Sequence, residues 1–341
     1  MVFKIDSTGR ESIYKQLVSQ VEHALHNGQL QPGEHIPSMN ELAAQLGISR
    51  ETVKNAYGIL VGKGLIIPKH GKGFYAADLQ RIGRLQVLVI FDKLSVYKQA
   101  LFNSFSNTLG NEAEVTIVNH NQSIDLLEYY LDNYLDNFDY YVVTPHFPLD
   151  EATQVRARKQ IGRIPNRKLI MLDRLLPDYP GNYGAVYQDF ENDIYCGLEQ
   201  GLGISRHTQV LRVITLPSSL YGEQIQRGIV RFCKEQNLEV EFLTSAPESI
   251  HPGDTFLLLN SQLNDGLVAL NRKIQDAGLT LGKDVLLISY NEADVYELVL
   301  GGLTTVSADF SEMGRLAAQM ILDRHLEKVH CPFRMNRRRT Y

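Results

Sequence analysis

Two serine caps on either side of a short turn constrain the fold of this 341-residue chain most strongly. Ser38 stands before an apolar helical pattern, with Glu41 three residues later, which is the spacing of a capping box. Gly47 ends that pattern, and Ser49 caps the next helical pattern. The inward face of this second helix is formed by Val53, Ala56, Tyr57 and Leu60. Two helices joined in this way are typical of a helix-turn-helix.

The segments around this helix pair complete a small domain. Apolar residues recur at helical spacing from Ser12 to Asn27, which predicts a helix before the pair. Short strand patterns at residues 65–67 and 74–76 flank a basic, glycine-rich turn, which predicts a hairpin after it. We therefore expect a winged helix-turn-helix domain over residues 1–77, followed by a linker over 78–85.

The helix that begins after Ser49 is expected to enter the major groove of DNA, where its first turn meets base edges. Arg50 suits the O6 and N7 atoms of guanine, Asn55 suits adenine, and Thr52 suits a phosphate or a thymine methyl group. Lys54 and, in the hairpin, Lys72 are placed for phosphates. The first 84 residues carry 10 Lys and Arg against 7 Asp and Glu, a local excess of positive charge in a chain of net charge -5.

Residues 37–43, 46–54 and 71–74 resemble segments of the GntR-type DNA-binding domain, and the resemblance covers residues 8–77. It implies that a dimer binds an operator through this helix, the cap before it and the hairpin. Asn40 departs from the family, which usually has arginine there, although asparagine can still bond a phosphate or adenine. The candidate DNA-contacting residues are Ser38, Asn40, Ser49, Arg50, Thr52, Lys54, Asn55, His70, Lys72 and Gly73.

A different pattern follows, in which short β-rich apolar runs alternate with helical patterns. Strands are expected at residues 86–91, 115–118, 140–144, 168–172, 210–216, 255–259 and 285–289. Helices are expected at residues 97–109, 124–137, 192–204, 223–236 and 264–277. This alternation predicts an α/β fold with Rossmann-like parallel, doubly wound sheets, and the number of strands allows two lobes over residues 86–341. Ligands of such folds bind beyond the carboxyl ends of strands, here in the cleft between lobes.

Residues 86–335 resemble the LacI-type sensor domain and its periplasmic sugar-binding relatives, most specifically from Leu281 to Met320. The segment from Phe333 to Thr340 looks like the final strand of such regulators, and the basic run 337–339 is expected to be solvated. The resemblance places effector ligands at strand ends. Ile225 stands where the family has a cleft arginine, and Glu223, Gln224 or Arg227 could take over the role of that arginine. The candidate effector-binding residues are Asp92, Tyr97, Thr144, His146, Asp173, Arg174, Glu223, Gln224, Arg227, Asn260 and Asn291.

Several of these candidates have a purely structural alternative. Asn260 and Asn291 could cap the loops that follow them, and Asp173 could pair with Arg174 or cap a turn. His146 could be a satisfied histidine of the fold without any ligand.

The sequence therefore predicts a homodimeric transcription regulator, a repressor by family precedent, that binds palindromic double-stranded DNA. Its effector is expected to be a small carbohydrate, such as arabinose or fucose, bound in the cleft of residues 86–341. The same domain is expected to form the dimer. The alternatives are a non-sugar metabolite effector, or a carbohydrate-binding protein without regulatory DNA binding.

Other functional classes lack support in the sequence. No Gly-x-Ser-x-Gly, phosphate-binding loop or His-Glu-x-x-His motif is present, so we expect no enzyme activity. Three widely spaced cysteines match no metal-ligand pattern, and no cofactor is expected. The apolar runs are too short to cross a membrane, and residues 1–6 lack the apolar region of an export signal. A cytoplasmic location is expected.

Overall fold

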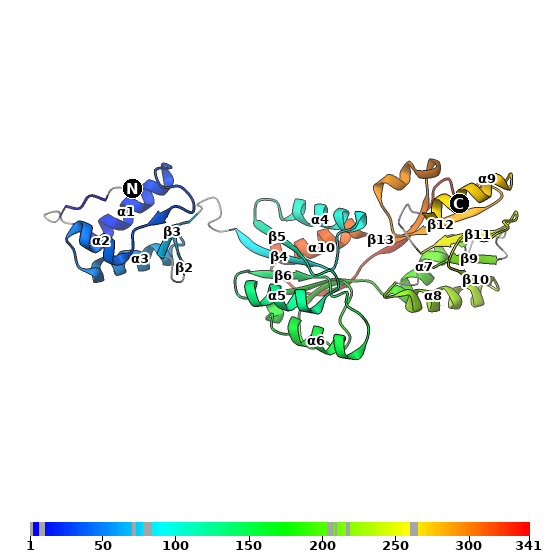
Figure 1. Cartoon of the computed structure of the whole chain (residues 1–341), viewed down its shortest axis with the longest axis horizontal. Coiled ribbons are helices and arrows are strands. Elements are labelled where there is room, and N and C mark those ends of the chain that lie inside the picture. The colour runs from blue at the N-terminus through cyan, green and yellow to red at the C-terminus, as the bar shows by residue number, and fades with distance from the viewer. Residues whose placement is uncertain are drawn as a thin grey trace. The chain divides into compact units, whose positions relative to one another are not determined.

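The computed structural model describes residues 3–6, 11–69, 73–77, 84–202, 208, 210–215, 219–259 and 265–341. The chain divides into two compact units, Met1–Arg84 and Leu85–Tyr341 (Figure 1).

The first unit is the expected winged helix-turn-helix. Its helices are α1 (Ile13–His26), α2 (Met39–Leu46) and α3 (Arg50–Gly62). Its strands are β1 (His35–Ile36), β2 (Ile66–Lys69) and β3 (Gly73–Ala76), which form an antiparallel sheet in the order β1-β3-β2.

The predicted caps set the geometry between α2 and α3. Ser38 Oγ accepts from the Glu41 backbone nitrogen at 3.3 Å, and the Glu41 carboxylate accepts from the Ser38 nitrogen at 2.7 Å. Gly47 ends α2 with φ 65°, a left-handed conformation that glycine adopts without strain. The Ser49 side chain then accepts from the Thr52 nitrogen at 3.1 Å and starts α3. The inward face of α3 is buried as predicted, so its polar face is left on the surface.

In the second unit, the described residues form a six-stranded sheet in each of two lobes. The first lobe has the order β14-β8-β7-β6-β4-β5 and is parallel throughout. The second lobe has the order β10-β9-β11-β12-β13-β15, in which β15 alone is antiparallel among the described strands. The strands are β4 (Leu85–Phe91), β5 (Ala113–Asn119), β6 (Tyr140–Val143), β7 (Leu169–Asp173), β8 (Gly184–Tyr187), β9 (Val210–Ile214), β10 (Glu239–Leu243), β11 (Thr255–Leu258), β12 (Leu286–Tyr290), β13 (Thr304–Ala308), β14 (Lys328–His330) and β15 (Phe333–Asn336).

Helices cover both faces of each sheet, as the doubly wound prediction requires (Figure 1). In the first lobe, β4 turns Val87 and Val89 towards α4 and α10, and Leu88 and Ile90 towards α5 and α6. In the second lobe, α7 and α8 pack on one face and α9 on the other. The helices are α4 (Val96–Leu109), α5 (Ile124–Tyr134), α6 (Glu151–Ile161), α7 (Phe190–Gly201), α8 (Gly222–Glu235), α9 (Asp265–Asp276) and α10 (Phe310–Leu322), with short 3-10 turns at Asn166–Lys168, Asp294–Glu297 and Val299–Gly301.

The chain passes between the lobes after β8, after β13 and after β14. A polar contact joins the lobes at these crossings: the buried Asp193 carboxylate on α7 lies 2.7 Å from the half-exposed His330 ring on β14. The lobes are therefore joined by extended segments, which is the arrangement of domains that open and close around a cleft.

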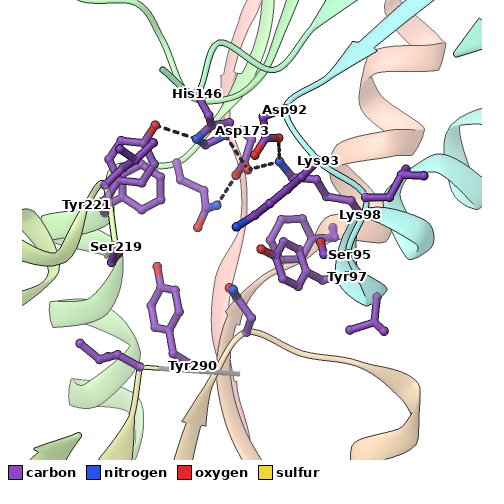
Figure 2. Close-up of a pocket in the computed structure, with 18 of the residues that line it drawn as sticks. Asp92, Lys93, Ser95, Tyr97, Lys98, His146, Asp173, Ser219, Tyr221 and Tyr290 are labelled. Carbon is purple, nitrogen blue, oxygen red and sulfur yellow. Dashed lines mark hydrogen bonds and ion pairs between the residues drawn. The ribbon is translucent and has the colours of Figure 1, made fainter. Parts of the chain in front are cut away.

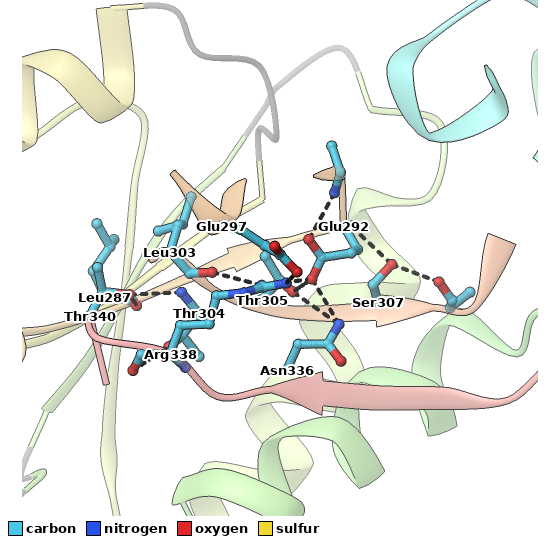
Figure 3. A network of polar contacts seen from close by, with 12 residues as sticks. Leu287, Glu292, Glu297, Leu303, Thr304, Thr305, Ser307, Asn336, Arg338 and Thr340 are labelled. Atoms are coloured by element: carbon cyan, nitrogen blue, oxygen red, sulfur yellow. Dashed lines mark hydrogen bonds and ion pairs between the residues drawn. The ribbon is translucent and has the colours of Figure 1, made fainter. Parts of the chain in front are cut away.

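The C-terminal segment is anchored through Glu292 (Figure 3). The Glu292 carboxylate accepts from Asn336 at 2.8 Å and from Arg338 at 2.9 Å, and Thr340 donates to the Leu287 carbonyl at 2.8 Å. The expectation of a solvated basic run is therefore wrong for Arg338. Its guanidinium pairs with the partly buried carboxylate of Glu292, which is distant in sequence.

The two helices α4 and α10 approach so closely that only glycine fits at residue 314. A Cβ atom built there would lie 2.1 Å from the backbone oxygen of Leu101. We expect Gly314→Ala to lower the free energy of unfolding of this unit by about 1–3 kcal/mol, because the backbones must move apart. Urea unfolding of the full chain measures the loss. Gly266→Ala is the matched control, since a Cβ atom at Gly266 meets open space, and an equal loss in both variants would contradict the packing argument.

Candidate functional sites

A cavity of about 680 Å³ lies between the lobes of the second unit, at the carboxyl ends of strands from both sheets (Figure 2). This is where ligands bind in open parallel α/β folds. The polar and aromatic side chains on its wall are Asp92, Lys93, Ser95, Tyr97, Lys98, Gln122, His146, Asp173, Gln188, Phe190, Ser219, Tyr221, Tyr290, Asn291, Tyr296 and Phe310.

A buried charge network forms the wall contributed by the first lobe. The Lys98 ammonium pairs with the Asp92 carboxylate and lies 3.8 Å from the Asp173 carboxylate. All three side chains are at most 6% exposed. Thr144 supports Asp92 from behind, because its hydroxyl accepts from the Asp92 backbone nitrogen at 2.7 Å. One cation therefore holds two carboxylates in place at the ends of β4 and β7.

The pKa values of both carboxyls reflect this network. Burial alone raises the pKa of Asp92, but the charges of Lys98 and His146 outweigh burial and leave that pKa below its usual value. Burial also opposes ionisation of Asp173, yet His146 and Lys98, with hydrogen bonds from His146 and Gln188, lower its pKa. Both groups are therefore carboxylates at neutral pH and act as hydrogen-bond acceptors.

A line of contacts connects this network to the second lobe. His146 Nε2 lies 2.9 Å from Asp173, and His146 Nδ1 lies 2.7 Å from the Tyr221 hydroxyl, which comes from the start of α8 (Figure 2). The Tyr221 ring stacks on Phe190, with centroids 4.3 Å apart, and the Arg174 guanidinium lies 5.2 Å from its centroid. Burial raises the pKa of Tyr221, so its hydroxyl stays protonated. The cavity therefore combines fixed acceptors with aromatic surface.

The structure brings five of the predicted effector residues to the cavity wall: Asp92, Tyr97, His146, Asp173 and Asn291. Thr144 and Arg174 are buried behind the wall, where Thr144 bonds Asp92 and Arg174 lies against Tyr221.

The proposed replacements for the family's arginine do not reach the wall. Glu223 and Gln224 are not among the lining residues, and Arg227 pairs instead with Glu191 at 2.8 Å on the surface. Ile225 itself lines the cavity. All four residues lie on α8. Successive residues of a helix point in different directions, so Ile225 faces inwards while Glu223, Gln224 and Arg227 do not. Asn260 lies outside the described residues.

Sequence reasoning missed Lys98, Gln188, Tyr221 and Tyr290. A signal for Lys98 is present in the sequence, because Lys98, Leu101, Phe105 and Leu109 form one helical stripe and all four are buried. A lysine on an apolar stripe needs a buried partner. The other three residues stand at strand or helix ends and have no such local signal.

In the first unit, the start of α3 presents a polar surface. Arg50, Lys54 and Asn55 are exposed, and Lys54 pairs with Glu51 at 3.2 Å. Ser49 and Thr52 are joined by a hydrogen bond of 2.8 Å between their hydroxyls, while Ser38 serves as the cap of α2. Asn40 is exposed on the first turn of α2. The predicted DNA-contacting candidates on α2 and α3 are therefore of two kinds. Some are exposed polar side chains, and others, such as Ser38 and Ser49, cap the helices.

The hairpin after α3 is formed as predicted, with Lys69 opposite Gly73. The Lys69 ammonium lies 4.5 Å from the centroid of the Tyr75 ring. Gly73 has φ 92°, which favours glycine, and His70 and Lys72 lie outside the described residues.

Family models match both units. The model for bacterial regulatory proteins of the gntR family matches residues 13–76, and the model for periplasmic binding protein-like domains matches residues 205–335. The chain joins a GntR-family DNA-binding domain to a LacI-type, periplasmic-binding-protein-like domain. A DNA-binding domain of bacterial regulatory proteins joined to a periplasmic-binding-protein-like domain is the architecture of a transcription regulator.

Individual relatives match the DNA-binding domain in sequence or the second unit in fold. The HTH-type transcriptional repressor NagR of Bacillus subtilis is 39% identical over 79 residues, which are 23% of this chain and 32% of that protein. The chain therefore spans about a third of the length of this curated relative. The trehalose repressor of Escherichia coli has a similar fold, with a TM-score of 0.56 and 15% identity over 74% of this chain and 99% of that structure. A regulator of Alkaliphilus metalliredigens complexed with D-xylulofuranose gives a TM-score of 0.54 at 12% identity, over 75% of this chain and 98% of that structure.

Two further observations apply to the part of the chain that the structure describes. None of its helices combines the length and the apolar composition that spanning a bilayer requires. In the same residues, no group of three or more His, Cys, Asp or Glu side chains could hold a metal ion.

Proposed function

We propose that the chain is a homodimeric repressor that binds a palindromic operator through residues 1–77 and responds to a small carbohydrate bound between the lobes of residues 86–341. The observation that carries the proposal is the cavity. It places carboxylates, amides and tyrosines from two hinged lobes in one chain with a GntR-family DNA-binding domain.

The DNA-binding half of the proposal is supported by the chemistry of α3. Its first turns expose a guanidinium at Arg50, an ammonium at Lys54 and an amide at Asn55. These groups match guanine, phosphate and adenine in the major groove. The operator sequence is expected to be a palindrome because two-fold related chains present two such helices.

The effector half is supported by the composition of the cavity wall. Carboxylate and amide oxygens accept hydrogen bonds from adjacent hydroxyl groups, and tyrosine and phenylalanine rings cover the apolar face of a sugar ring. A solved structure of similar fold holds D-xylulofuranose, which supports the carbohydrate class for this cavity. Monosaccharides such as arabinose and fucose are the first candidates.

The mechanism follows from differential binding. An effector that contacts both lobes binds the closed arrangement better than the open one and shifts the equilibrium by that difference, typically about 1–3 kcal/mol of coupling. Lobe closure would alter the spacing of two DNA-binding domains in a dimer and weaken the hold on the operator.

The test combines two measurements on the full chain. A thermal-shift screen of monosaccharides identifies ligands, since a true ligand stabilises by about 2.7 kcal/mol at a hundredfold excess over its Kd. Fluorescence anisotropy with a labelled promoter fragment then measures operator release. We expect one sugar to raise the Tm and to weaken DNA binding. Stable DNA binding in the presence of every sugar, with no thermal shift, would contradict the proposal.

A further inference from the structure

Four polar atoms on the cavity wall are buried and have no hydrogen-bond partner among the residues that the structure describes. They are Ser95 Oγ, Gln188 Oε1, the Tyr290 hydroxyl and Asn291 Oδ1, and the last three carry the argument because they lie where the two lobes meet. Gln188 is 7% exposed and Tyr290 is 5% exposed. A buried polar group without a partner is costly, so such groups at a cavity indicate where a ligand supplies hydrogen bonds.

The orientation of the Gln188 amide is fixed by its neighbour. Its Nε2 group donates to the Asp173 carboxylate, which can only accept. The Gln188 oxygen is therefore the atom left over, and it requires a donor from the ligand.

The unpaired groups come from both lobes. Gln188 follows β8 in the first lobe, whereas Tyr290 ends β12 in the second lobe and Asn291 follows it. Asn291 has φ 69°, a left-handed conformation that asparagine tolerates better than most residues. A single ligand that satisfies these atoms would link the two lobes directly.

The charges on the wall disfavour an anionic ligand at this place. Asp92 and Asp173 share Lys98, so a phosphate or carboxylate would meet two carboxylates and compete with them for one buried ammonium. Lys93 also lines the cavity, but it is exposed, and water screens an exposed charge.

We infer that the effector is a neutral polyhydroxyl molecule that donates a hydroxyl hydrogen bond to Gln188 and contacts Tyr290 and Asn291 across the cleft, and that phosphorylated and carboxylated sugars are poor ligands. The inference rests on the proposed function of the cavity as an effector site. It adds the polarity and charge of the effector and the atoms that bring the lobes together.

The first test compares ligands on the unmodified full chain by calorimetry. L-arabinose, L-fucose and D-xylose are the neutral probes, and D-arabinose 5-phosphate, L-fucose 1-phosphate and L-arabinonate are the anionic probes. We expect at least one neutral sugar to bind at least roughly 100-fold more tightly than any anionic probe, because the anionic group cannot donate to the unpaired oxygens and meets the carboxylates of Asp92 and Asp173. Tighter binding of an anionic probe would overturn the inference and leave the proposed carbohydrate effector intact. If neither class binds or releases operator DNA, the proposed function fails and the inference with it.

The second test removes one unpaired group. We expect Tyr290→Phe to weaken the affinity for the neutral sugar by about fivefold to tenfold without lowering the Tm of the ligand-free protein. The hydroxyl has no described partner to lose, so its removal does not harm the free protein. Tyr195→Phe is the matched control, because the Tyr195 hydroxyl contacts Glu235 at 2.6 Å on the surface, away from the cavity wall. Unchanged sugar affinity in Tyr290→Phe, or a loss equal to that of the control, would overturn the assignment.

Discussion

Lys98→Met is expected to lower the free energy of unfolding of the Leu85–Tyr341 unit by about 3–5 kcal/mol, because removing one partner of a buried ion pair leaves the other uncompensated. The Lys98 side chain is 2% exposed, and its ammonium is the cation between Asp92 and Asp173. Methionine has a similar length and fills the space, so the loss reports charge rather than a cavity. Urea unfolding of the full chain measures the loss of stability. Far-UV circular dichroism is the suitable signal, because the chain contains no tryptophan for fluorescence.

The pH dependence of this loss distinguishes charge from packing. The pKa values of Asp92 and Asp173 are lowered in the folded protein, so these groups contribute stability above their unfolded pKa of about 3.9 and lose it as the pH falls. Without Lys98, less positive charge opposes burial at either carboxyl, so both pKa values rise from their wild-type positions, and protonation relieves the carboxylates that have lost their cation. The difference between wild type and Lys98→Met is therefore expected to be smaller at acidic pH than at neutral pH.

An exposed ion pair provides the control for the same substitution type. Arg156 contacts Asp125 at 2.6 Å, but its side chain is 48% exposed. Arg156→Met should leave the unfolding midpoint nearly unchanged, since solvent compensates an exposed charge. If Lys98→Met proves as mild as this control, or if its loss is independent of pH, the buried network does not hold the cavity wall together.

Much of the fold could be predicted because local signals and tertiary packing agree. The inward stripe of α3 ends in Tyr57 and Leu60, both fully buried, and the caps at Ser38 and Ser49 start the helices where predicted. Helix α6 was not predicted, for a physical reason. Its buried face includes Gln154 and Gln160 beside Ala157 and Ile161, so no continuous apolar stripe is visible in the sequence.

The candidate site was predictable only in part. Asp92 and Asp173 could be proposed because each ends a buried strand, and strand ends meet at one edge of a parallel sheet. Gln188 and Tyr290 could not, since their importance lies in an absent partner, which only the three-dimensional arrangement reveals. The misplacement of Arg227 has the same origin: sequence gives its proximity to Ile225, whereas packing decides which of them faces the cavity.

Arg50→Ala is expected to weaken binding to the true operator by about 1–3 kcal/mol, roughly fivefold to 150-fold, and to relax the choice of base at one position of each half-site. Arg50 is the first residue of α3 and is exposed, so its guanidinium is free to reach a guanine edge when α3 lies in the major groove. Fluorescence anisotropy with the operator and with single-base variants of it measures both effects. The fold should be unaffected, because the side chain is not part of the buried face of α3.

Two lysines separate base recognition from phosphate attraction in this experiment. Lys54→Ala should weaken binding to all DNA sequences alike and reduce the slope of log affinity against log salt by about one, as for a phosphate contact. Lys63, which follows α3 and pairs with Glu22 at 2.7 Å, lies at the far end of the helix, and Lys63→Ala should leave base preference unchanged. If Arg50→Ala binds operator with unchanged affinity across salt concentrations, the first turn of α3 is not the part of the domain that meets the bases. Selectivity would then have to come from the hairpin or from the deformability of the DNA.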